Sequence, residues 1–288
     1  MNYSALIENR KSVRVFTDSR VSPAMLGQIR KYHREEVKRL LPDLRTDLVI
    51  LGDDARDALE GAAGYNKFLI GAPYYMVLLS ESHDLAHLNA GYVMEDLVLK
   101  LAEMELSGCY VTFTDSDRVK NAVGINSPLD VAAIVAFGYG VKTTKRLRLN
   151  ILSMSNVDIS AKRHYFDPKR SISELVFRNQ WGNTAGVEDE IGFFDDMLWE
   201  SFRAASLAPS YLNRQAYGFV IHNGTISLVE RPDEYNTRLD GDLSLGIVML
   251  HFSAVAEQWV GKLRWKFGDQ AAKLSLEPGY RVVASCDL

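Results

Sequence analysis

The amino-acid sequence predicts an α+β protein built as two unequal lobes, residues 1–180 and 181–288. A length of 288 residues exceeds what one small core requires and suits two lobes. Apolar residues recur at helical spacing in residues 91–106, whereas residues 131–137 form a continuous apolar run of strand length. The Gly-x-Val-Met sequence at residues 91–94, where this long helix is expected to begin, recurs at residues 246–249. This faint repeat favours two related halves.

The first lobe is expected to begin with short elements. Residues 3–9 are predicted to form a helix, and a second helix begins near Ser22 and Pro23, a pair that suits an N-cap and a first turn. Residues 48–51 and the apolar end of residues 66–80 are predicted to be strands.

Between the lobes, residues 142–167 are polar and weakly periodic, so we expect a surface crossing or a lid. The second lobe then repeats the pattern in outline. A helix is predicted from about Asp195, and a hairpin is predicted over residues 216–229 because Asn-Gly favours a tight turn. Residues 246–260 are apolar nearly all round, so this last helix is expected to be buried between layers.

Composition and charge exclude several classes of protein. With 47% hydrophobic and 24% charged residues the chain is typical of a soluble globular protein, and a net charge of −4 argues against a nucleic-acid partner. No secretory signal and no membrane span are recognised, so we expect a cytoplasmic location. Cys109 and Cys286 form no C-x-x-C pattern, which favours reduced thiols. His83 and His87 do not fit H-E-x-x-H, and no metal site is predicted.

Two short stretches carry candidate binding chemistry. Residues 10–14 read Arg-Lys-Ser-Val-Arg, whose three cations and hydroxyl suit a phosphate group, although a solvated basic turn would look the same. A helical run is predicted to end at Ala208, because Pro209 has no N–H, and Ser210, Asn213 and Gln215 follow within the next residues. Such polar residues can simply terminate a helix. Each stretch alone therefore leaves its function open.

Together the two stretches resemble the paired signature of the FMN-dependent nitroreductase family. In that family R-x-S-x-R binds the flavin phosphate, and A-P-S-x-x-N-x-Q closes over the isoalloxazine ring from the other subunit; here residues 208–215 read A-P-S-Y-L-N-R-Q. Residues 242–252 are similar to D-x-G-I-x-x-x-H-F of the two-lobed, single-chain branch, with one inserted residue. The resemblance implies a mostly antiparallel sheet flanked by helices, internally duplicated as a pseudo-dimer, with one complete FMN site per chain.

The resemblance also implies which residues bind the cofactor. The phosphate is expected to be bound by Arg10, Lys11, Ser12, Arg14, Lys169 and Arg170, and the flavin ring to lie near Lys67, Thr112, Phe113, Thr114, Pro209, Ser210, Asn213 and Gln215. Tyr211 and Tyr217 are expected to shape the acceptor pocket. A structural alternative remains for Lys169 and Arg170, which can simply solvate the start of the next element. The family's Gly-rich turn is replaced by residues 109–119, and its Pro-Trp pair after the glutamine by Ala216 and Tyr217.

The implied activity is that of an FMN-dependent NAD(P)H oxidoreductase. NAD(P)H reduces the flavin at N5 and leaves, and a nitroaromatic, quinone or similar electron-poor molecule is then reduced in its place, so no titrating catalytic residue is expected. Two alternatives stay open: a flavin-binding protein with little turnover, acting as a sensor, carrier or partner-binding relic, or a flavoenzyme of the same fold with another reaction such as reductive dehalogenation. The chain is expected to act as a monomer with an internal pseudo-dimer or as a weak homodimer.

Overall fold

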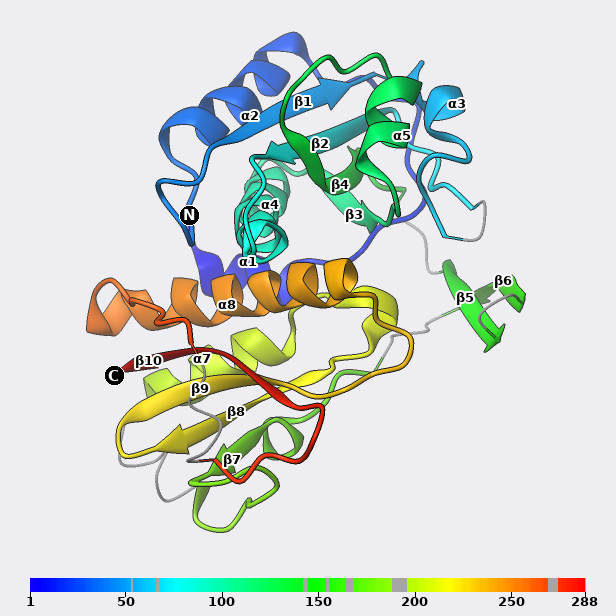
Figure 1. The fold of residues 1–288 in the computed structure, drawn as a ribbon. Helices are drawn as coiled ribbons and strands as arrows, with labels where there is room; N and C mark the ends of the chain where they lie inside the picture. The colour runs from blue at the N-terminus through cyan, green and yellow to red at the C-terminus, as the bar shows by residue number, and fades with distance from the viewer. Residues whose placement is uncertain are drawn as a thin grey trace. The chain divides into compact units, whose positions relative to one another are not determined.

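The structure, a computed structural model, describes residues 1–52, 54–65, 68–141, 145–153, 156–163, 168–187, 196–268 and 274–287, with the backbone alone for residues 145–163. The chain divides into two compact units (Figure 1). Unit 1 comprises Met1 and Asn9–Asp167, and unit 2 comprises Asn2–Glu8 and Pro168–Leu288. Most of helix α1, Tyr3–Asn9, therefore belongs with the C-terminal half of the chain. The lobe boundary at residue 180 stays a prediction from the sequence.

Unit 1 contains a four-stranded antiparallel sheet in the order β1-β2-β4-β3. The strands are β1 Thr46–Leu51, β2 Tyr74–Ser80, β3 Ser107–Val111 and β4 Asp130–Gly138. Every residue of β2 is buried, and so is every residue of β4 except Asp130. Burial of both faces explains why residues 131–137 form an uninterrupted apolar run instead of an alternating one.

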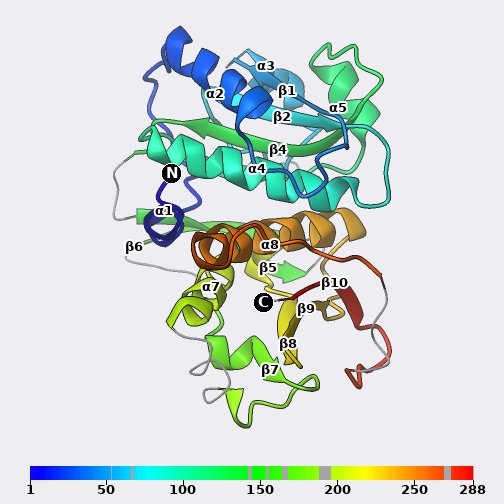
Figure 2. The same ribbon diagram turned by 90° about the vertical axis from the view of Figure 1, so that its left-hand side faces the viewer.

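Helix α4, Ala86–Glu103, contacts β2, β3 and β4 and runs along this sheet (Figure 2). Its buried side includes charged groups, because Glu95 and Asp96 are both 0% exposed. Asp96 accepts hydrogen bonds from the Tyr32 hydroxyl and the Lys38 backbone N–H, each 2.8 Å long. Buried carboxylates require such partners. Helix α4 thus anchors the chain that precedes it through polar contacts as well as apolar packing.

Unit 1 also contains the helices α2 Pro23–Glu35, α3 Ala55–Leu59 and α5 Ser116–Ala122. The predicted start of α2 is confirmed, since the Ser22 hydroxyl accepts a hydrogen bond of 3.3 Å from the Met25 N–H.

The segment expected to be a crossing or a lid contains regular structure. Its described backbone forms an antiparallel hairpin of β5, Lys145–Ser153, and β6, Asn156–Arg163. Residues 142–144, 154–155 and 164–167 lie outside the described part of the chain. In residues 146–149 basic and apolar residues alternate. Such alternation is typical of a β-strand, but the polar composition of the whole segment hides it in the sequence.

Unit 2 contains a second four-stranded sheet, in the order β10-β9-β8-β7. The strands are β7 Val176–Arg178, β8 Tyr217–His222, β9 Thr225–Glu230 and β10 Arg281–Asp287. The predicted hairpin is confirmed as β8 and β9, and both residues of its Asn-Gly turn have positive φ. All pairings are antiparallel except that β7 runs parallel to β8.

Two helices, α7 Asp196–Ser206 and α8 Arg238–Val260, pack against one another and against β8. The Phe219 ring of β8 lies 5.2 Å from the Phe202 ring of α7 and 5.5 Å from the Phe252 ring of α8, measured between centroids. Neighbouring strand residues face opposite sides of a sheet. The next residue, Val220, accordingly joins a separate apolar cluster with Phe177, Val229, Leu274 and Val282.

Among the described residues, α8 is the one helix long and apolar enough to span a membrane by length and composition, but 89% of its apolar window is buried. It is the core helix that the sequence predicts, and it begins at Arg238, earlier than the predicted residue 246. The α+β prediction, with mostly antiparallel sheets flanked by helices, is confirmed by the two units. Strands β3, β7 and β10 were not predicted.

We expect His33 to make unit 1 sensitive to acid. The side chain is 3% exposed, its Nε2 lies 3.2 Å from Thr46 Oγ1, and burial, followed by the charge of Arg39, lowers its pKa from 6.5 to about 4. Between these values the unfolded chain binds a proton that the folded chain does not. The free energy of unfolding should therefore fall as pH falls, by about 2 to 3 kcal/mol between pH 7 and 4.5.

Urea denaturation across this pH range measures the effect. The control is His33→Gln, which cannot titrate, so its stability should decline less steeply because only other groups contribute. Parallel profiles for the two proteins would contradict the prediction.

Candidate functional site

The basic segment at residues 10–14 lies along the edge strand β3. Ser12 forms a parallel bridge with Gly108, and the Val13 N–H donates to the Gly108 carbonyl at 3.2 Å. The Ser12 hydroxyl also hydrogen-bonds to Cys109, whose pKa is raised by burial in spite of Arg14 and Arg10 nearby. Cys109 is consequently a protonated structural thiol.

The two arginines of this segment differ in their partners. Arg10 Nε lies 3.3 Å from Glu95 Oε1, and the two side chains are 8% and 0% exposed. Glu95 also accepts a 2.9 Å hydrogen bond from the Tyr110 hydroxyl, whose pKa is raised well above its usual value by burial and by the charge of Glu95. By contrast, no described residue forms an ion pair or hydrogen bond with the Arg14 guanidinium. Arg14 therefore has charge and donors available to a ligand.

The predicted ring-side residues 112–114 follow the other end of β3. The Thr112 carbonyl accepts a 2.7 Å hydrogen bond from the Gly64 N–H, and Phe113 bridges Ala63. Phe113 is 5% exposed and packs as a core residue, whereas Thr114 is exposed. The predicted residue Lys67 lies outside the described residues.

In unit 2 the site is organised at the C-terminal end of α7. A helix leaves its last carbonyls without intrahelical partners. Here side chains from separate parts of the sequence donate to the last carbonyls of α7. His251 Nδ1 donates to Ala204 at 3.0 Å, the Tyr217 hydroxyl to Ala205 at 2.9 Å, and Gln215 Nε2 to Ser206 at 3.1 Å. Two residues beyond the helix, the Ala208 carbonyl accepts a 2.7 Å hydrogen bond from Lys169 Nζ. The helix end is thereby fixed to α8, to β8 and to the segment before η1, Ile172–Glu174.

The turn that follows α7 has an unusual backbone. It includes the short 3₁₀ helix η2, Tyr211–Asn213, and three of its residues have positive φ: Leu212 at 49°, Asn213 at 56° and Gln215 at 46°. Non-glycine residues rarely adopt this conformation, and such residues concentrate at functional sites. The turn is held by hydrogen bonds from the Gln215 N–H to Ser210 Oγ and from the Tyr211 N–H to Ser244 Oγ, both 3.0 Å long.

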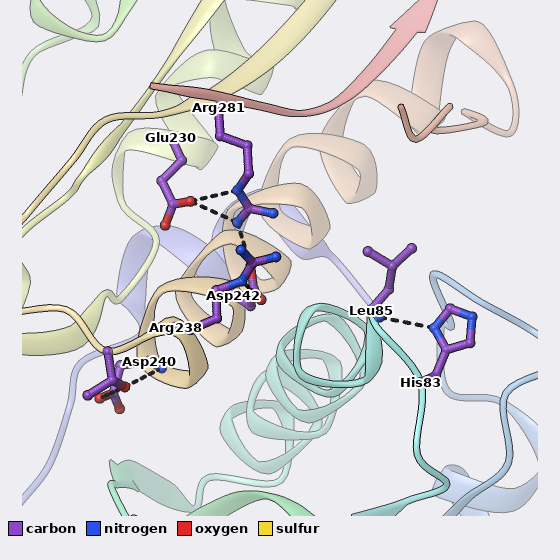
Figure 3. A network of polar contacts seen from close by, with 8 residues as sticks. His83, Leu85, Glu230, Arg238, Asp240, Asp242 and Arg281 are labelled. Carbon is purple, nitrogen blue, oxygen red and sulfur yellow. Dashed lines mark hydrogen bonds and ion pairs between the residues drawn. The ribbon is translucent and has the colours of Figure 1, made fainter. Parts of the chain in front are cut away.

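Ser244 Oγ donates to the Asp240 carbonyl at 2.7 Å in the first part of α8, where Asp242 is the centre of an ion-pair network (Figure 3). Asp242, 4% exposed, accepts hydrogen bonds of 2.6 Å from both Arg238 and Arg281. Arg281 also donates to Glu230 at 2.8 Å, which links α8 to the end of β9. The network fixes the part of α8 on which the turn rests.

Gln215 connects the predicted phosphate-binding residues of unit 2 to the turn. Its side chain is 2% exposed, and its Oε1 accepts a 3.0 Å hydrogen bond from the Arg170 backbone N–H. Asn213 Nδ2 donates to the Pro168 carbonyl at 2.8 Å. Residues more than 40 positions apart in sequence are therefore adjacent. The Arg170 guanidinium itself has no hydrogen-bond or ion-pair partner in the part of the chain that the structure describes.

The predicted residues of unit 2 differ in what they present to a ligand. Tyr217 is 2% exposed, burial raises its pKa to about 12, and its hydroxyl is bonded to α7, so here it supports the turn. Ser210, Tyr211 and Asn213 are partly exposed, while Pro209 is buried. The acceptor-pocket role of Tyr211 and Tyr217 stays a prediction.

Sequence reasoning missed several residues that build the site. Glu95 lies within a helix whose charged residues suggest a solvated side, and nothing in the sequence identifies the Ala204 carbonyl as the partner of His251. Arg231, which contacts the turn, belongs to no motif. Their roles become visible only from contacts between residues far apart in sequence.

Comparisons with known proteins identify the family and the fold of the chain. The family model described as "Putative TM nitroreductase" matches residues 2–256. The structure of a putative nitroreductase from Thermotoga maritima is similar with 18% identity and a TM-score of 0.60, covering 100% of this chain and 94% of that chain, which confirms the predicted fold.

Smaller structures match about half of the chain. An FMN-dependent nitroreductase from Clostridium difficile has 19% identity and a TM-score of 0.41, covering 48% of this chain and 87% of that chain. A nitroreductase family protein from Clostridium novyi has 17% identity and a TM-score of 0.42, covering 49% and 87%. No curated protein matches the chain.

We expect Gln215→Met to destabilise unit 2. The change keeps the length of the side chain but leaves the buried Arg170 N–H and Ser206 carbonyl without their partner. Each lost partner costs about 1 to 3 kcal/mol, so the free energy of unfolding should fall by about 2 to 4 kcal/mol in urea denaturation.

Gln258→Met is the matched control. Gln258 is exposed, and its amide donates only to Ala254 of its own helix, so this change should cost less than about 0.5 kcal/mol. Equal losses for the two variants would count against the role assigned to Gln215.

Proposed function

Because the chain belongs to the family described as "Putative TM nitroreductase", we propose that it is an FMN-dependent oxidoreductase that uses NAD(P)H to reduce electron-poor small molecules such as nitroaromatics or quinones. The proposal assigns one FMN to each chain, with no nucleic-acid or membrane partner. It also retains the expectation that the chain acts as a monomer or a weak homodimer.

The observation that carries the proposal is that, in unit 2, the predicted phosphate-binding residues are hydrogen-bonded to the predicted ring-bordering turn. The expected phosphate-binding segment with Lys169 and Arg170 is tied to the expected ring-bordering turn by Gln215 and Asn213. A basic segment beside an ordered polar turn is an arrangement that suits a cofactor with an anionic tail and a planar ring. A turn that only ended a helix would require no such attachment.

The side chains present also fit the chemistry of a flavin phosphate. Arg14 in unit 1 and Arg170 in unit 2 each offer a guanidinium with no described partner. A planar guanidinium can donate to two phosphate oxygens at once. Arg10 fits this role less simply, because one side of its guanidinium faces Glu95.

FMN, when bound, supplies the hydride-transfer chemistry. The residues of this chain would bind and orient it. Arg14 in unit 1 and Arg170 in unit 2 are each proposed to donate to a flavin phosphate, and within unit 2 the partly exposed Ser210 and Asn213 would present polar atoms to the ring edge. Gln215 uses both ends of its amide inside the protein, so its role is to hold the turn in place.

The first test is flavin binding. We expect the purified protein to carry FMN, and we expect Arg14→Gln and Arg170→Gln each to weaken FMN binding about 10-fold or more, since a charge-assisted hydrogen bond contributes about 1.5 to 3 kcal/mol. Fluorescence titration of the apoprotein measures this. Arg30→Gln, an exposed change of equal charge on α2, is the control and should bind like the unaltered protein.

Turnover is tested separately by anaerobic mixing of the FMN-loaded protein with NADH or NADPH. An oxidoreductase should bleach its flavin absorbance within seconds. A flavin that binds but stays oxidised would identify a binding protein with little turnover, and a protein that takes up no FMN would end the proposal.

A further inference from the structure

The hairpin of β5, Lys145–Ser153, and β6, Asn156–Arg163, is a sheet of two strands only. Among the described helices and strands, none pairs with its edges and none has more than marginal contact with it. An isolated two-stranded hairpin is marginally stable at best in water, and a further strand or a packed surface is needed to stabilise it. The hairpin therefore needs a partner that the described elements of one chain do not supply.

The register of the hairpin separates apolar from basic residues. Residues directly opposite each other on paired strands share a face of the sheet, and neighbours along a strand lie on opposite faces. One face therefore holds three opposed pairs of apolar residues: Leu147 with Ala161, Leu149 with Ile159, and Ile151 with Val157. The other face holds the polar pairs that alternate with them: Arg146 with Lys162, Arg148 with Ser160, and Asn150 with Asp158. The hairpin is thus amphipathic, with an apolar face and a basic face.

Charge limits the partners that can cover the apolar face. Residues 145–163 include five lysines and arginines against one aspartate, although the whole chain has a net charge of −4. An anionic lipid surface attracts basic segments, but its potential acts only within a Debye length, about 8 Å. A bilayer that covered the apolar face would leave Arg146, Arg148 and Lys162 on the face away from the lipid headgroups. The arrangement favours an apolar partner over a charged surface.

A second copy of this chain presents a face of the same size and chemistry. Two hairpins packed by their apolar faces have backbones about 10 Å apart, with both basic faces on the outside. A twofold axis perpendicular to the strands also separates the open ends, where Lys145 is opposite Arg163. Six apolar residues from each copy, at about 60 to 100 Å² each, would bury about 700 to 1,200 Å² in total. This area lies at the low end for specific interfaces and suits a weak dimer.

We propose that the apolar face of β5 and β6 is a self-association surface, through which two copies of this chain form a weak homodimer with twofold symmetry. Each copy supplies the layer that the hairpin of the other copy lacks. This inference goes beyond the proposed function and does not depend on flavin binding.

Sedimentation of the full chain over a wide range of concentration is the first test. We expect an equilibrium between monomer and dimer that salt leaves unchanged or strengthens, because the interface is apolar and salt screens the like charges. Leu149→Gln should weaken dimerisation about tenfold or more, since it removes an apolar residue from both copies. Arg148→Gln, on the opposite face, is the matched control and should dimerise like the unaltered protein. A monomer at every concentration, or a Leu149→Gln variant that dimerises normally, would overturn the proposal.

A chemical crosslink distinguishes loss of the interface from local unfolding of the hairpin. The twofold axis sets β5 opposite β5 of the other copy, so a short bifunctional maleimide should join Leu149→Cys but not Arg148→Cys into dimers. The native Cys109 and Cys286 are buried, and the unaltered protein gives the background. Equal crosslinking of the two variants would refute the assigned face. Binding to anionic phospholipid vesicles by a protein that stays monomeric in solution would also overturn the proposal, because the apolar face would then fit a membrane.

Discussion

The end of helix α7 is the constraint on which unit 2 depends. Its carbonyls at Ala204, Ala205 and Ser206 have no complete set of helical partners, and the donors that satisfy them come from α8, from β8 and from the turn itself. Many helices end on a glycine, and water often satisfies their last carbonyls. Here the termination of one helix also sets the position of three other elements, so the motif after Pro209 serves the fold and the site together.

The arginines of the two units fall into two groups, those that pair with buried carboxylates and those that do not. Arg10, Arg238 and Arg281 face buried carboxylates, whereas Arg14 and Arg170 form no ion pair with a described residue. Removing the arginine partner of a carboxylate that is already buried is strongly destabilising. Arginines left unpaired do not improve stability, so they need another reason to be present. The basic groups of one chain thus separate into those that hold the structure and those that remain available to an anion.

Much of this organisation follows from local sequence. The apolar strand at residues 131–137, the Ser22 cap and the Asn-Gly hairpin obey short-range rules, and the structure confirms them. Strand β3 was not predicted because Ser107 and Gly108 resemble a helix end, and it forms because β4 offers a partner. The resemblance located Gln215 and Tyr217 but not their bonds to α7. Glu95 and Arg231 depend on contacts between residues far apart in sequence, which no window of residues contains.

The backbone around Leu212, Asn213 and Gln215 also bears on how the protein could be engineered. Asparagine tolerates the left-handed region, but leucine and glutamine do so at a cost that glycine would not incur. Directed evolution for heat resistance would accordingly favour glycine at position 212. A looser chain there would no longer be confined to one shape, so selection for thermostability and selection for the function proposed here would act on this residue in opposite directions.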